Sequence, residues 1–544
     1  MKRNWIYMFL ALIVTLAIGY YFVQPFDTQE NSPIYKKLNV FESSKGGNEG
    51  YGVSASNSLA VKIGMDILAH NGNAVDAAIA ISYVLGVVEP YGSGLGGGGG
   101  MLILPGDKDK SPTFIDYREM SPTSSSRKKG AIGIPGFVKG MEFAHEKYGV
   151  KNLAELIDPS IELAEKGFRI QKSLTDRLAG AQSRLSVNKL PQFFPEGSPI
   201  QPDEWLKQPE LAETLKLIKA KGSDVFYRGE IAEALAHEVS GITVSDLKNY
   251  SVFEKEPVYG EFSGFEVISA PPPFSGITLI QSLQMAEMLS VKGTKGNTSD
   301  YIHLTGEISK RAYKDRIQHI GDPEFVKIPI KKLTKKEYSE GLSKDISLDE
   351  LSNHYEMDDH NEEHTSTTHF VVTDKEGTVV SVTNTLSNFF GTGKNVGGFF
   401  LNNNLENFNE TSGSPNKYEP GKRSRTFTTP TILRNDEQII GVGTPGGRRI
   451  PMMLTEVLVR HLLFDEPLQE AIDAPRFYVE DNHIQTEIRY PKGVQNELKK
   501  MGYKMGMNSY PIYYGGIQAL VIDKKENVIY GGTDSRREGT WKVK

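Results

Sequence analysis

The 544-residue chain contains no cysteine. It therefore has no disulfide bond, no thiolate metal ligand and no thiol nucleophile, and any covalent catalysis must use an oxygen or a nitrogen atom. An excess of basic residues is missing as well, because 62 Lys and Arg residues stand against 68 Asp and Glu residues. Nucleic-acid affinity depends on such an excess, so the composition disfavours a nucleic-acid-binding protein.

Long hydrophobic runs are scarce, and the clearest one lies near the N-terminus. Residues 6–23 form an uncharged run of 18 residues after Lys2 and Arg3, which is just long enough to span a bilayer core. Basic residues on its N-terminal side predict that everything downstream lies outside the cell membrane. We expect residues 1–25 to be one apolar helix that serves as a membrane anchor. A cleaved secretory signal remains the alternative, although no clean small-x-small site follows the run.

Residues 26–50 are polar and rich in Asn, Ser, Gly and Lys, as in a linker. The sequence beyond them mixes helix and strand patterns. Apolar periodicity and capping residues predict helices at residues 56–71, 73–88, 154–165, 210–219 and 277–288, the second of them buried on most sides. Residues 331–366 are dense in charged and polar side chains, and we expect little of this segment to pack.

A β-hairpin is predicted directly after that segment. Residues 367–374 and 378–385 are rich in β-branched side chains and flank Lys375, Glu376 and Gly377. If the loop has these three residues, Asp374 opposes Thr378 and Thr367 lies opposite Thr385. The two threonine hydroxyls would then be within hydrogen-bonding reach.

Two motifs are better explained by ordinary structure than by ligand binding. Residues 94–99 match G-x-G-x-x-G by letter, but a helix is predicted before them and a strand after them, the reverse of a dinucleotide site. His354, His360 and His364 lie among acidic residues at a spacing that matches no standard metal site. No metal and no cofactor is expected. A G-x-S-x-G elbow, which would support a serine hydrolase, is also missing.

Several short pieces, spread over more than 300 residues, resemble the γ-glutamyltranspeptidase family of N-terminal-nucleophile hydrolases. They are residues 96–100, 116–119, 271–273, 275–276, 367–369, 385, 401–403 and 445–447. Residues 384–390 and 421–427 resemble more closely the capsule branch of the family, the CapD-type poly-γ-glutamate hydrolase/transpeptidases, which attach capsule to the cell wall.

The resemblance implies an α+β fold, a four-layer αββα sandwich, and self-cleavage between Ser366 and Thr367. The products would be a large subunit of residues 51–366 and a small subunit of residues 367–544, which form a heterodimer. Thr367 would be the nucleophile, because cleavage frees its α-amine, with an ordinary pKa of about 7.7–8.0, to act as the base. By the same resemblance, Thr385 would hold the nucleophile's hydroxyl, and the backbone N–H groups of Gly446 and Gly447 would bind the oxyanion.

Substrate-binding residues follow from the resemblance too, with informative departures. Arg118 would clamp the α-carboxylate of the substrate. Asn407 stands where relatives that take glutathione carry an Asp, and Thr426 and Phe427 stand where they carry paired serines. An internal residue of poly-γ-glutamate has an acylated, uncharged nitrogen, which a neutral amide accommodates and a carboxylate does not. Further positive charges near the expected site are Arg425, Arg448, Arg536 and Arg537.

The sequence thus predicts an enzyme on the outer face of the cell membrane or in the cell wall. It would cleave poly-γ-glutamate through a γ-glutamyl-Thr367 ester and transfer the acyl group to a cell-wall amine or to water. Three alternatives stay open. The chain could be a glutathione-type γ-glutamyltranspeptidase, or it could be a surface-anchored binding protein with the fold but no activity. The third is that the extra arginines form surface pairs without contacting substrate and that Asn407 is a neutral substitution.

Overall fold

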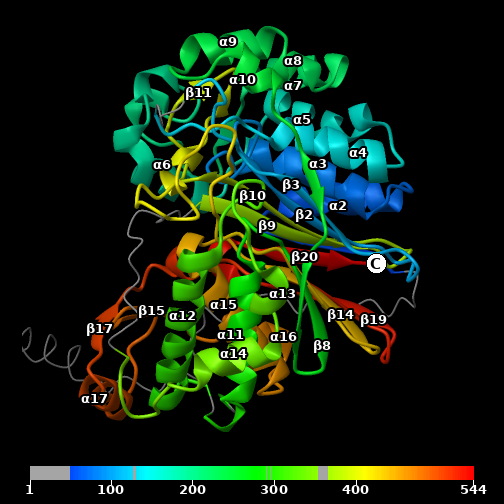
Figure 1. Cartoon of the computed structure of the whole chain (residues 1–544). Coiled ribbons are helices and arrows are strands. Elements are labelled where there is room, and N and C mark those ends of the chain that lie inside the picture. The colour runs from blue at the N-terminus through cyan, green and yellow to red at the C-terminus, as the bar shows by residue number, and fades with distance from the viewer. Residues whose placement is uncertain (1–49, 126–129, 290, 295, 353–365) are drawn as a thin grey trace, which may run out of the picture. The chain divides into compact units, whose positions relative to one another are not determined.

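The computed structural model describes residues 50–125, 130–289, 291–294, 296–352 and 366–544 (Figure 1). The apolar helix predicted within residues 1–25 and the histidines His354, His360 and His364 lie outside these ranges. Within them, no helix combines the length and the apolar character that a membrane crossing requires.

Two antiparallel sheets form the centre of the described part. The first contains, in spatial order, β20 (Thr540–Val543), β1 (Gly52–Ala55), β9 (Ser366–Thr373), β10 (Val379–Ser387), β2 (Gly98–Leu104), β3 (Thr113–Tyr117) and β6 (Phe253–Lys255). The second contains, in order, β19 (Val528–Thr533), β18 (Gln518–Asp523), β14 (Gln438–Gly443), β13 (Thr431–Arg434), β8 (Phe265–Ser269) and β7 (Val258–Phe262).

Hydrophobic clusters define four layers. Leu102 and Phe114 of the first sheet pack against Ile268, Ile432 and Leu520 of the second. On the outer side of the first sheet, α2 (Ser58–Ala69), α3 (Ala74–Val88) and α4 (Phe137–Tyr148) contact its strands. The same hydrophobic cluster includes residues of α5 (Leu153–Lys166), α6 (Lys172–Ala181), α7 (Pro209–Lys221), α8 (Asp224–Tyr227), α9 (Glu230–Glu238) and α10 (Val244–Lys248). On the outer side of the second sheet, α11 (Gly276–Met288) and α16 (Leu468–Asp473) contact its strands, and the same cluster includes residues of α12 (Ser299–His319), α13 (Ile330–Leu333), α14 (Lys336–Ser343) and α15 (Ile450–Leu462). The predicted mixed α/β fold is confirmed, and the layers follow the expected order of helices, sheet, sheet, helices (Figure 1).

Smaller elements lie at the periphery. One group is a three-stranded sheet with a helix, formed by β15 (Phe477–Glu480), β16 (His483–Thr486), β17 (Lys504–Met507) and α17 (Lys492–Lys500). The others are two short strand pairs, β4 (Phe168–Arg169) with β5 (Trp205–Leu206) and β11 (Asn395–Val396) with β12 (Phe399–Phe400).

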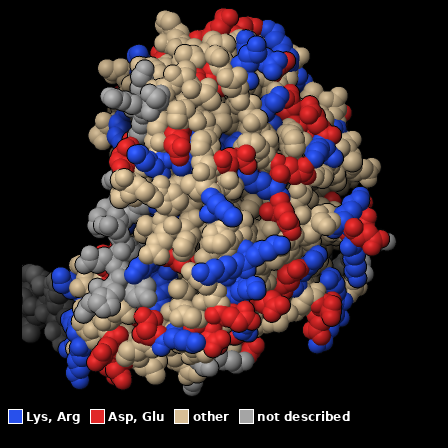
Figure 2. All heavy atoms as spheres, viewed as in Figure 1, with Lys and Arg blue, Asp and Glu red and all other residues tan. Residues whose placement is uncertain are grey.

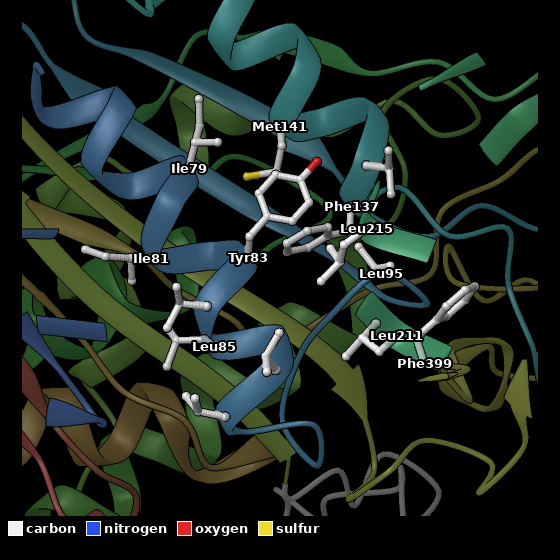
Figure 3. Close-up of a cluster of buried hydrophobic side chains, with 14 of the residues drawn as sticks. Ile79, Ile81, Tyr83, Leu85, Leu95, Phe137, Met141, Leu211, Leu215 and Phe399 are labelled. Atoms are coloured by element: carbon white, nitrogen blue, oxygen red, sulfur yellow. The ribbon is translucent and has the colours of Figure 1, made fainter. Parts of the chain in front are cut away.

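Helix α3 is the buried centre of the first helical layer, as its composition predicted. A capping box between Asn73 and Asp76 starts it, which satisfies backbone N–H groups that the helix itself cannot. All its residues except Gly86 are buried. Figure 3 shows Ile79 and Tyr83 of α3 beside Phe137 and other apolar side chains of the neighbouring helices.

The predicted hairpin forms with the predicted register. Asp374 bonds with Thr378 across the turn, and positions 368–373 pair with positions 379–384 in reverse order. A β-bulge after Asn384 then shifts the pairing so that Ser387 lies opposite Ser366. The bulge re-aims the end of β10 at the start of β9, where the candidate nucleophile lies.

The glycine-rich segment packs backbone against backbone, in line with its interpretation as structure. It follows α3 and runs into β2. A Cβ at Gly96 would lie 2.1 Å from the Phe400 carbonyl oxygen, and one at Gly97 would lie 2.2 Å from the Thr385 carbonyl oxygen. Side chains at these positions would therefore push the β10 end and the β12 segment away.

The expectation that residues 331–366 pack little is wrong for the first part of the segment. Helices α13 and α14 form there, and Leu333 is fully buried against α11. Gln281 and Gln284 of α11 donate hydrogen bonds to the carbonyls of Leu333 and Thr334, each at 3.1 Å. One apolar side chain and these side-chain-to-backbone bonds suffice for docking, and composition does not reveal them. Residues 353–365 lie outside the described ranges.

Candidate active site

Thr367 lies at the start of β9 and faces the space between the two sheets. Alternation along the strand places Val371 in the cluster between the sheets and Phe370 and Val372 against the helices. Thr367 belongs to the same set as Val371 and is 5% exposed. Thr368 has the opposite orientation, and its hydroxyl has no hydrogen-bond partner among the described residues.

Two threonine hydroxyls converge on one carbonyl group. Thr367 Oγ1 donates to the Ser366 carbonyl oxygen at 2.6 Å, and Thr385 Oγ1 donates to the same oxygen at 2.7 Å. The two Oγ1 atoms are 3.3 Å apart, so the hydrogen-bonding reach predicted from the hairpin is confirmed. The Ser387 N–H donates to Thr385 Oγ1 at 2.9 Å, which fixes that hydroxyl. The peptide carbonyl that precedes Thr367 is therefore polarised by two donors, one of which is the candidate nucleophile itself.

A small cavity of about 20 Å³ opens beside these hydroxyls. Its lining consists of Arg118, Thr367, Thr385, Ser387, Asn407, Arg425, Thr426, Phe427, Thr428, Gly447 and Ile450. This volume is enough for a water molecule but far too small for an amino-acid side chain. The uncleaved chain thus holds most of the predicted site residues together without room for a substrate.

Arg118 presents a buried positive charge to this cavity. Its side chain is fully buried, and none of its guanidinium nitrogens makes a hydrogen bond to a described residue. Its partner is the carboxylate of Glu119, with Nη1 and Oε2 3.2 Å apart. Burial raises the pKa of Glu119, and Arg118 offsets only part of that effect. A carboxylate that entered the cavity would supply the hydrogen bonds that Arg118 lacks.

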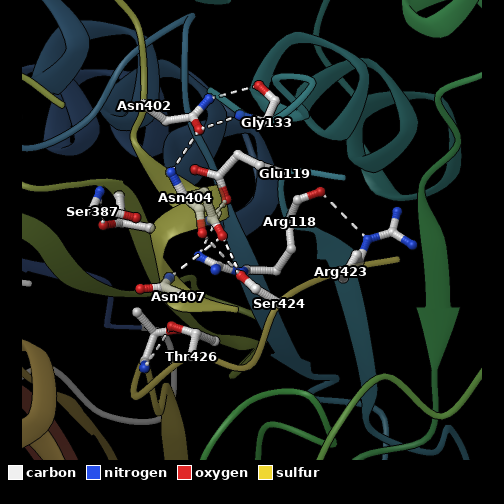
Figure 4. Close-up of polar contacts among 12 residues, drawn as sticks. Arg118, Glu119, Gly133, Ser387, Asn402, Asn404, Asn407, Arg423, Ser424 and Thr426 are labelled. Carbon is white, nitrogen blue, oxygen red and sulfur yellow. Dashed lines mark hydrogen bonds and ion pairs between the residues drawn. The ribbon is translucent and has the colours of Figure 1, made fainter. Parts of the chain in front are cut away.

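Asn407 belongs to a polar network behind the cavity (Figure 4). Its Nδ2 donates to Asn404 Oδ1 at 3.4 Å, while Asn404 in turn donates to Glu119 Oε2 and accepts from the Ser424 hydroxyl. The Oδ1 atom of Asn407 has no hydrogen-bond partner among the described residues, and the residue is 4% exposed. The network thus leaves a buried acceptor at the cavity wall, available to an N–H group of a ligand.

One of the two predicted oxyanion glycines, Gly447, lines the cavity, and Gly446 does not. Gly446 has φ 142°. Gly447 has φ 59°, in the left-handed region that favours glycine. Neither N–H group donates a hydrogen bond to a described residue, so both are available to a developing oxyanion.

The other predicted arginines differ in position. Arg425 lines the cavity, and its Nη1 lies 3.4 Å from the carbonyl oxygens of Arg316 and Ile317. Arg448 follows Gly447 and pairs with Glu480. Arg536 does not line the cavity. It binds Glu487 through two 2.6 Å hydrogen bonds, together with Asp534 and two backbone carbonyls.

Arg537 does not line the cavity either. It donates to the carbonyls of Ile512 and Gly515, each at 3.1 Å, in the segment that packs against Gly446. Burial lowers the pKa of Arg537 to about 9, with Arg177 as the next contributor. Arg537 therefore holds the segment that packs against Gly446 and does not contact the cavity.

Three lining residues were not predicted from the sequence: Ser387, Thr428 and Ile450. Ser387 has φ 76°, an unusual conformation for a serine, and is brought to the site by the bulge in β10. A bulge has no sequence signature here, so only the structure reveals this residue. Among the described residues, no group of three or more His, Asp or Glu side chains is arranged to hold a metal ion.

The chain is similar to a family of known enzymes over nearly all of its length. A family model described as gamma-glutamyltranspeptidase matches residues 60–543. The chain is 48% identical over 492 residues to the capsule biosynthesis protein CapD proenzyme of Bacillus anthracis, covering 90% of each chain. It is 34% identical over 584 residues to the glutathione hydrolase proenzyme of Bacillus subtilis (strain 168), covering 99% of this chain and 98% of the other. The structure of a cephalosporin acylase from Bacillus halodurans superposes with a TM-score of 0.81 at 24% identity, over 95% of this chain and 99% of that one, which shows the shared fold alone.

Proposed function

Because the chain belongs to the gamma-glutamyltranspeptidase family, we propose that it is a self-cleaving enzyme that acts on poly-γ-glutamate. As a family member it is an enzyme of the γ-glutamyl transpeptidase and hydrolase class. Thr367 would take a γ-glutamyl group from the polymer and pass it to an amine or to water. The observation that carries this proposal is the convergence of the Thr367 and Thr385 hydroxyls on the Ser366 carbonyl beside the cavity that Arg118 lines.

Self-cleavage follows from that geometry. Thr367 Oγ1 attacks the Ser366 carbonyl carbon, and the Thr385 hydroxyl stabilises the negative charge that develops on the carbonyl oxygen. The proton of the Thr367 hydroxyl passes to the amide nitrogen as the C–N bond breaks, so the acyl group moves from nitrogen to oxygen and an ester remains. Water then hydrolyses the ester, which gives a Ser366 carboxylate, a free Thr367 hydroxyl and a free Thr367 amine. The proenzyme names of both relatives support this step.

Turnover uses the groups that cleavage has made. The Thr367 amine accepts the proton of its own hydroxyl, and Oγ1 attacks the γ-carbonyl of the substrate. Gly446 and Gly447 donate to the oxyanion, and the amide nitrogen leaves with the proton. A γ-glutamyl-Thr367 ester remains, which an acceptor amine or a water molecule then attacks. Before cleavage the same nitrogen is an amide and cannot act as a base.

The uncharged side chain of Asn407, which lines the cavity, supports the polymer as the substrate. Its buried Oδ1 accepts the amide N–H of an internal polymer residue, and no carboxylate at that position repels the neighbouring glutamates. Arg118 and Arg425 line the cavity as well. On the face shown in Figure 2, Lys and Arg are interspersed with Asp and Glu, and the chain carries a net charge of −6, so attraction for a polyanion would have to be local.

The cellular location belongs to the proposal too. The apolar run at residues 6–23 supports export. We place the enzyme on the outer face of the cell membrane or in the cell wall, where a cell-wall amine would serve as acceptor.

A matched pair of variants tests the nucleophile. Thr367→Val keeps the shape of the side chain but removes its hydroxyl, and Thr368→Val does the same at the adjacent, opposite-facing residue. Denaturing electrophoresis should show two fragments for the wild type and for Thr368→Val, and a single chain for Thr367→Val. Turnover of poly-γ-glutamate should fall at least about 10³-fold in Thr367→Val alone. Cleavage that persists in Thr367→Val would contradict the proposal.

The second candidate is hydrolysis of glutathione, favoured by the full-length similarity to the Bacillus subtilis relative. The two candidates separate when the cleaved enzyme is given poly-γ-glutamate and glutathione at equal concentrations of γ-glutamyl groups. We expect a higher kcat/KM for the polymer. A higher kcat/KM for glutathione would establish the second candidate in its place.

A further inference from the structure

The cavity beside Thr367 has a single aromatic wall. Phe427 is 8% exposed, and the only other lining residue with an apolar side chain of comparable bulk is Ile450. All other lining positions are charged, hydroxyl-bearing, amide or glycine. An acyl group bound here meets polar groups at its carbonyl end and around Arg118 and Asn407. The hydrocarbon between its two ends must pack against Phe427 and Ile450.

The Phe427 ring is fixed from behind. The guanidinium carbon of Arg316, on α12, lies 3.6 Å from the ring centroid, and the Tyr313 ring centroid lies 5.4 Å away. Such cation–π stacking is worth about 0.5–2 kcal/mol, the higher value applying to desolvated pairs such as this one. Arg316 is 2% exposed and Tyr313 4% exposed, so neither can easily move away.

Hydrogen bonds connect the same wall to the turn before α11. Arg316 Nε donates to Ser275 Oγ at 3.0 Å, and Ser275 Oγ donates to the Thr426 carbonyl at 2.7 Å. The Thr426 N–H in turn donates to the Pro273 carbonyl at 3.0 Å. The backbone that carries Phe427 is thus held on both sides of Thr426.

Self-cleavage changes the cavity at the Ser366–Thr367 bond. The Ser366 carbonyl now lies against the Thr367 and Thr385 hydroxyls, and breaking the peptide bond frees it to move. The cavity of about 20 Å³ must enlarge before a substrate enters. It enlarges toward Ser366, because the Phe427 side is immobilised by Arg316 and by the hydrogen bonds to Ser275.

We propose that Phe427 is a specificity-determining residue that limits the length of the acyl group transferred by Thr367. A fixed wall at a set position accepts the two methylene groups of a γ-glutamyl donor and rejects a donor with three. This inference rests on the proposed function, because it assumes acyl transfer through Thr367. It adds that the site selects its donor by the number of methylene groups in the acyl chain.

Three donors that differ by one methylene test the wall. They are the p-nitroanilides of N-acetylated β-aspartate, γ-glutamate and δ-(α-aminoadipate), which carry one, two and three methylenes and, like an internal polymer residue, an uncharged nitrogen. A missing methylene costs about 10–200-fold in kcat/KM in a fitted apolar site. We expect the wild-type enzyme to prefer the γ-glutamyl donor by at least about 10-fold over either neighbour.

Phe427→Ala should reverse part of this preference. Its kcat/KM should fall for the γ-glutamyl donor and rise for the aminoadipyl donor, so that their ratio changes by at least about 10-fold. Phe427→Leu should change the ratio less, because leucine restores part of the wall. Arg316→Met should shift it in the same direction as alanine, because the ring loses its backing. Tyr313→Phe keeps the ring beside Phe427 and removes only the hydrogen bond from the Tyr313 hydroxyl to the Arg448 carbonyl. It is the control whose ratio between the two donors should match the wild type, even if the hydroxyl affects the rate for both.

The outcomes separate the inference from the function on which it rests. One outcome is that the wild-type enzyme prefers the γ-glutamyl donor while Phe427→Ala keeps the same ratio of kcat/KM between the γ-glutamyl and aminoadipyl donors. That result overturns the inference and leaves the proposed function standing. A cleaved wild-type enzyme that hydrolyses none of the three donors overturns the proposed function, and the inference with it. If Phe427→Ala does not cleave itself, Phe427→Leu and Arg316→Met decide the question by the same ratio.

Discussion

At the scale of single residues, the site combines an unsatisfied cation with an unsatisfied neutral acceptor. The guanidinium of Arg118 and the Oδ1 atom of Asn407 are buried, line the same cavity and have no hydrogen-bond partner among the described residues. Leaving buried polar groups unpaired costs free energy in the empty enzyme, on the order of 1–3 kcal/mol for each group. A ligand that brings a carboxylate and an N–H group recovers this cost. These unpaired atoms therefore indicate the chemical groups of the donor substrate better than the shape of the cavity does.

Asn407→Asp tests whether the side chain at this position of the cavity must be uncharged. The new carboxylate repels the acidic polymer and cannot be neutralised by an acylated nitrogen, so we expect kcat/KM for poly-γ-glutamate to fall about 10–100-fold. For a γ-glutamyl amide with a free α-ammonium group, kcat/KM should rise. Asn407→Ala is the control, because it removes the acceptor without adding charge and should lower the first value without raising the second. A rise for the free ammonium donor in both variants would contradict this role of charge.

At the scale of elements, a close contact between β9 and β14 helps to set the spacing between the nucleophile strand and the loop that carries Gly446 and Gly447. His369, two residues after Thr367 on β9, packs on Gly443 at the end of β14, three residues before Gly446. A Cβ at position 443 would lie 2.2 Å from His369 Cε1. Burial lowers the pKa of His369 to about 3, so the imidazole is neutral at physiological pH and acts by its shape. Its Nδ1 pairs with Thr383 Oγ1 at 2.8 Å, which fixes the ring on the neighbouring strand.

Gly443→Ala should therefore separate β9 from β14. We expect a loss of about 1–3 kcal/mol in the free energy of unfolding, and a fall in kcat larger than the change in KM, because Thr367 and Gly447 move apart. Urea denaturation and steady-state kinetics on the cleaved enzyme measure the two effects. Gly180→Ala in α6 is the control, since a Cβ there meets nothing within 4 Å. His369→Ala in the Gly443→Ala background should restore part of kcat, and a double variant no better than Gly443→Ala would contradict the steric explanation.

Five of the described helices, α2, α3, α5, α7 and α11, were predicted from local apolar patterns, and their predicted bounds lie within two residues of the observed ones. Side-chain caps reinforce the signal at α2, α3 and α5. The remaining described helices, including the long α12, were not predicted. The hairpin register was predictable too, since three turn residues fix it. Strand order was not, because β2 pairs with β10 across nearly 300 residues and no local pattern encodes that choice.

The site was predictable only in part, and for the same reason. Thr367 and Thr385 share a hairpin, so their contact follows from its register. Arg118 and Asn407 reach the same cavity from distant segments, and only the resemblance to a family suggested their meeting. The bulge that brings in Ser387 and the contacts that hold Arg536 away from the cavity have no sequence signature. They depend on packing that only the folded chain defines.

At the scale of the whole molecule, buried carboxyl groups make stability depend on pH. Glu456, in the middle of α15, is 2% exposed, and its Oε1 has no hydrogen-bond partner among the described residues. Burial raises its pKa from 4.5 to about 8, although Arg476 and Arg460 oppose the shift. A raised carboxyl pKa means that the folded state binds the proton more tightly than the unfolded state. Its stabilising contribution is complete below about pH 4.5 and is lost as the pH rises toward 8.

Glu456→Gln should remove this dependence, because the amide does not titrate. In the wild type we expect the melting temperature to fall between pH 6 and pH 9, with a loss of about 3 kcal/mol attributable to Glu456. In the variant the curve should be flatter over the same range. Burial also raises the pKa of Glu89 to about 6, so a smaller fall around that pH should remain in both proteins. Parallel curves for wild type and variant above pH 7 would contradict the assignment.

Both sheets contain strands from before and after the Ser366–Thr367 bond. This arrangement should keep the two fragments together after cleavage. In the first sheet, β1 lies between β20 and β9, and β2 pairs with β10. In the second sheet, β8 from before the bond pairs with β13 from after it. Separating the two fragments would break these ladders and expose all three hydrophobic clusters, so dissociation amounts to unfolding. We expect the fragments to co-elute as one heterodimer in size-exclusion chromatography at nanomolar concentration and at 1 M salt, and to separate only in denaturant. The Thr367→Val chain, which stays uncleaved, gives the reference elution volume. A fragment that elutes alone in native buffer would show that the interleaved sheets do not hold the cleaved enzyme together.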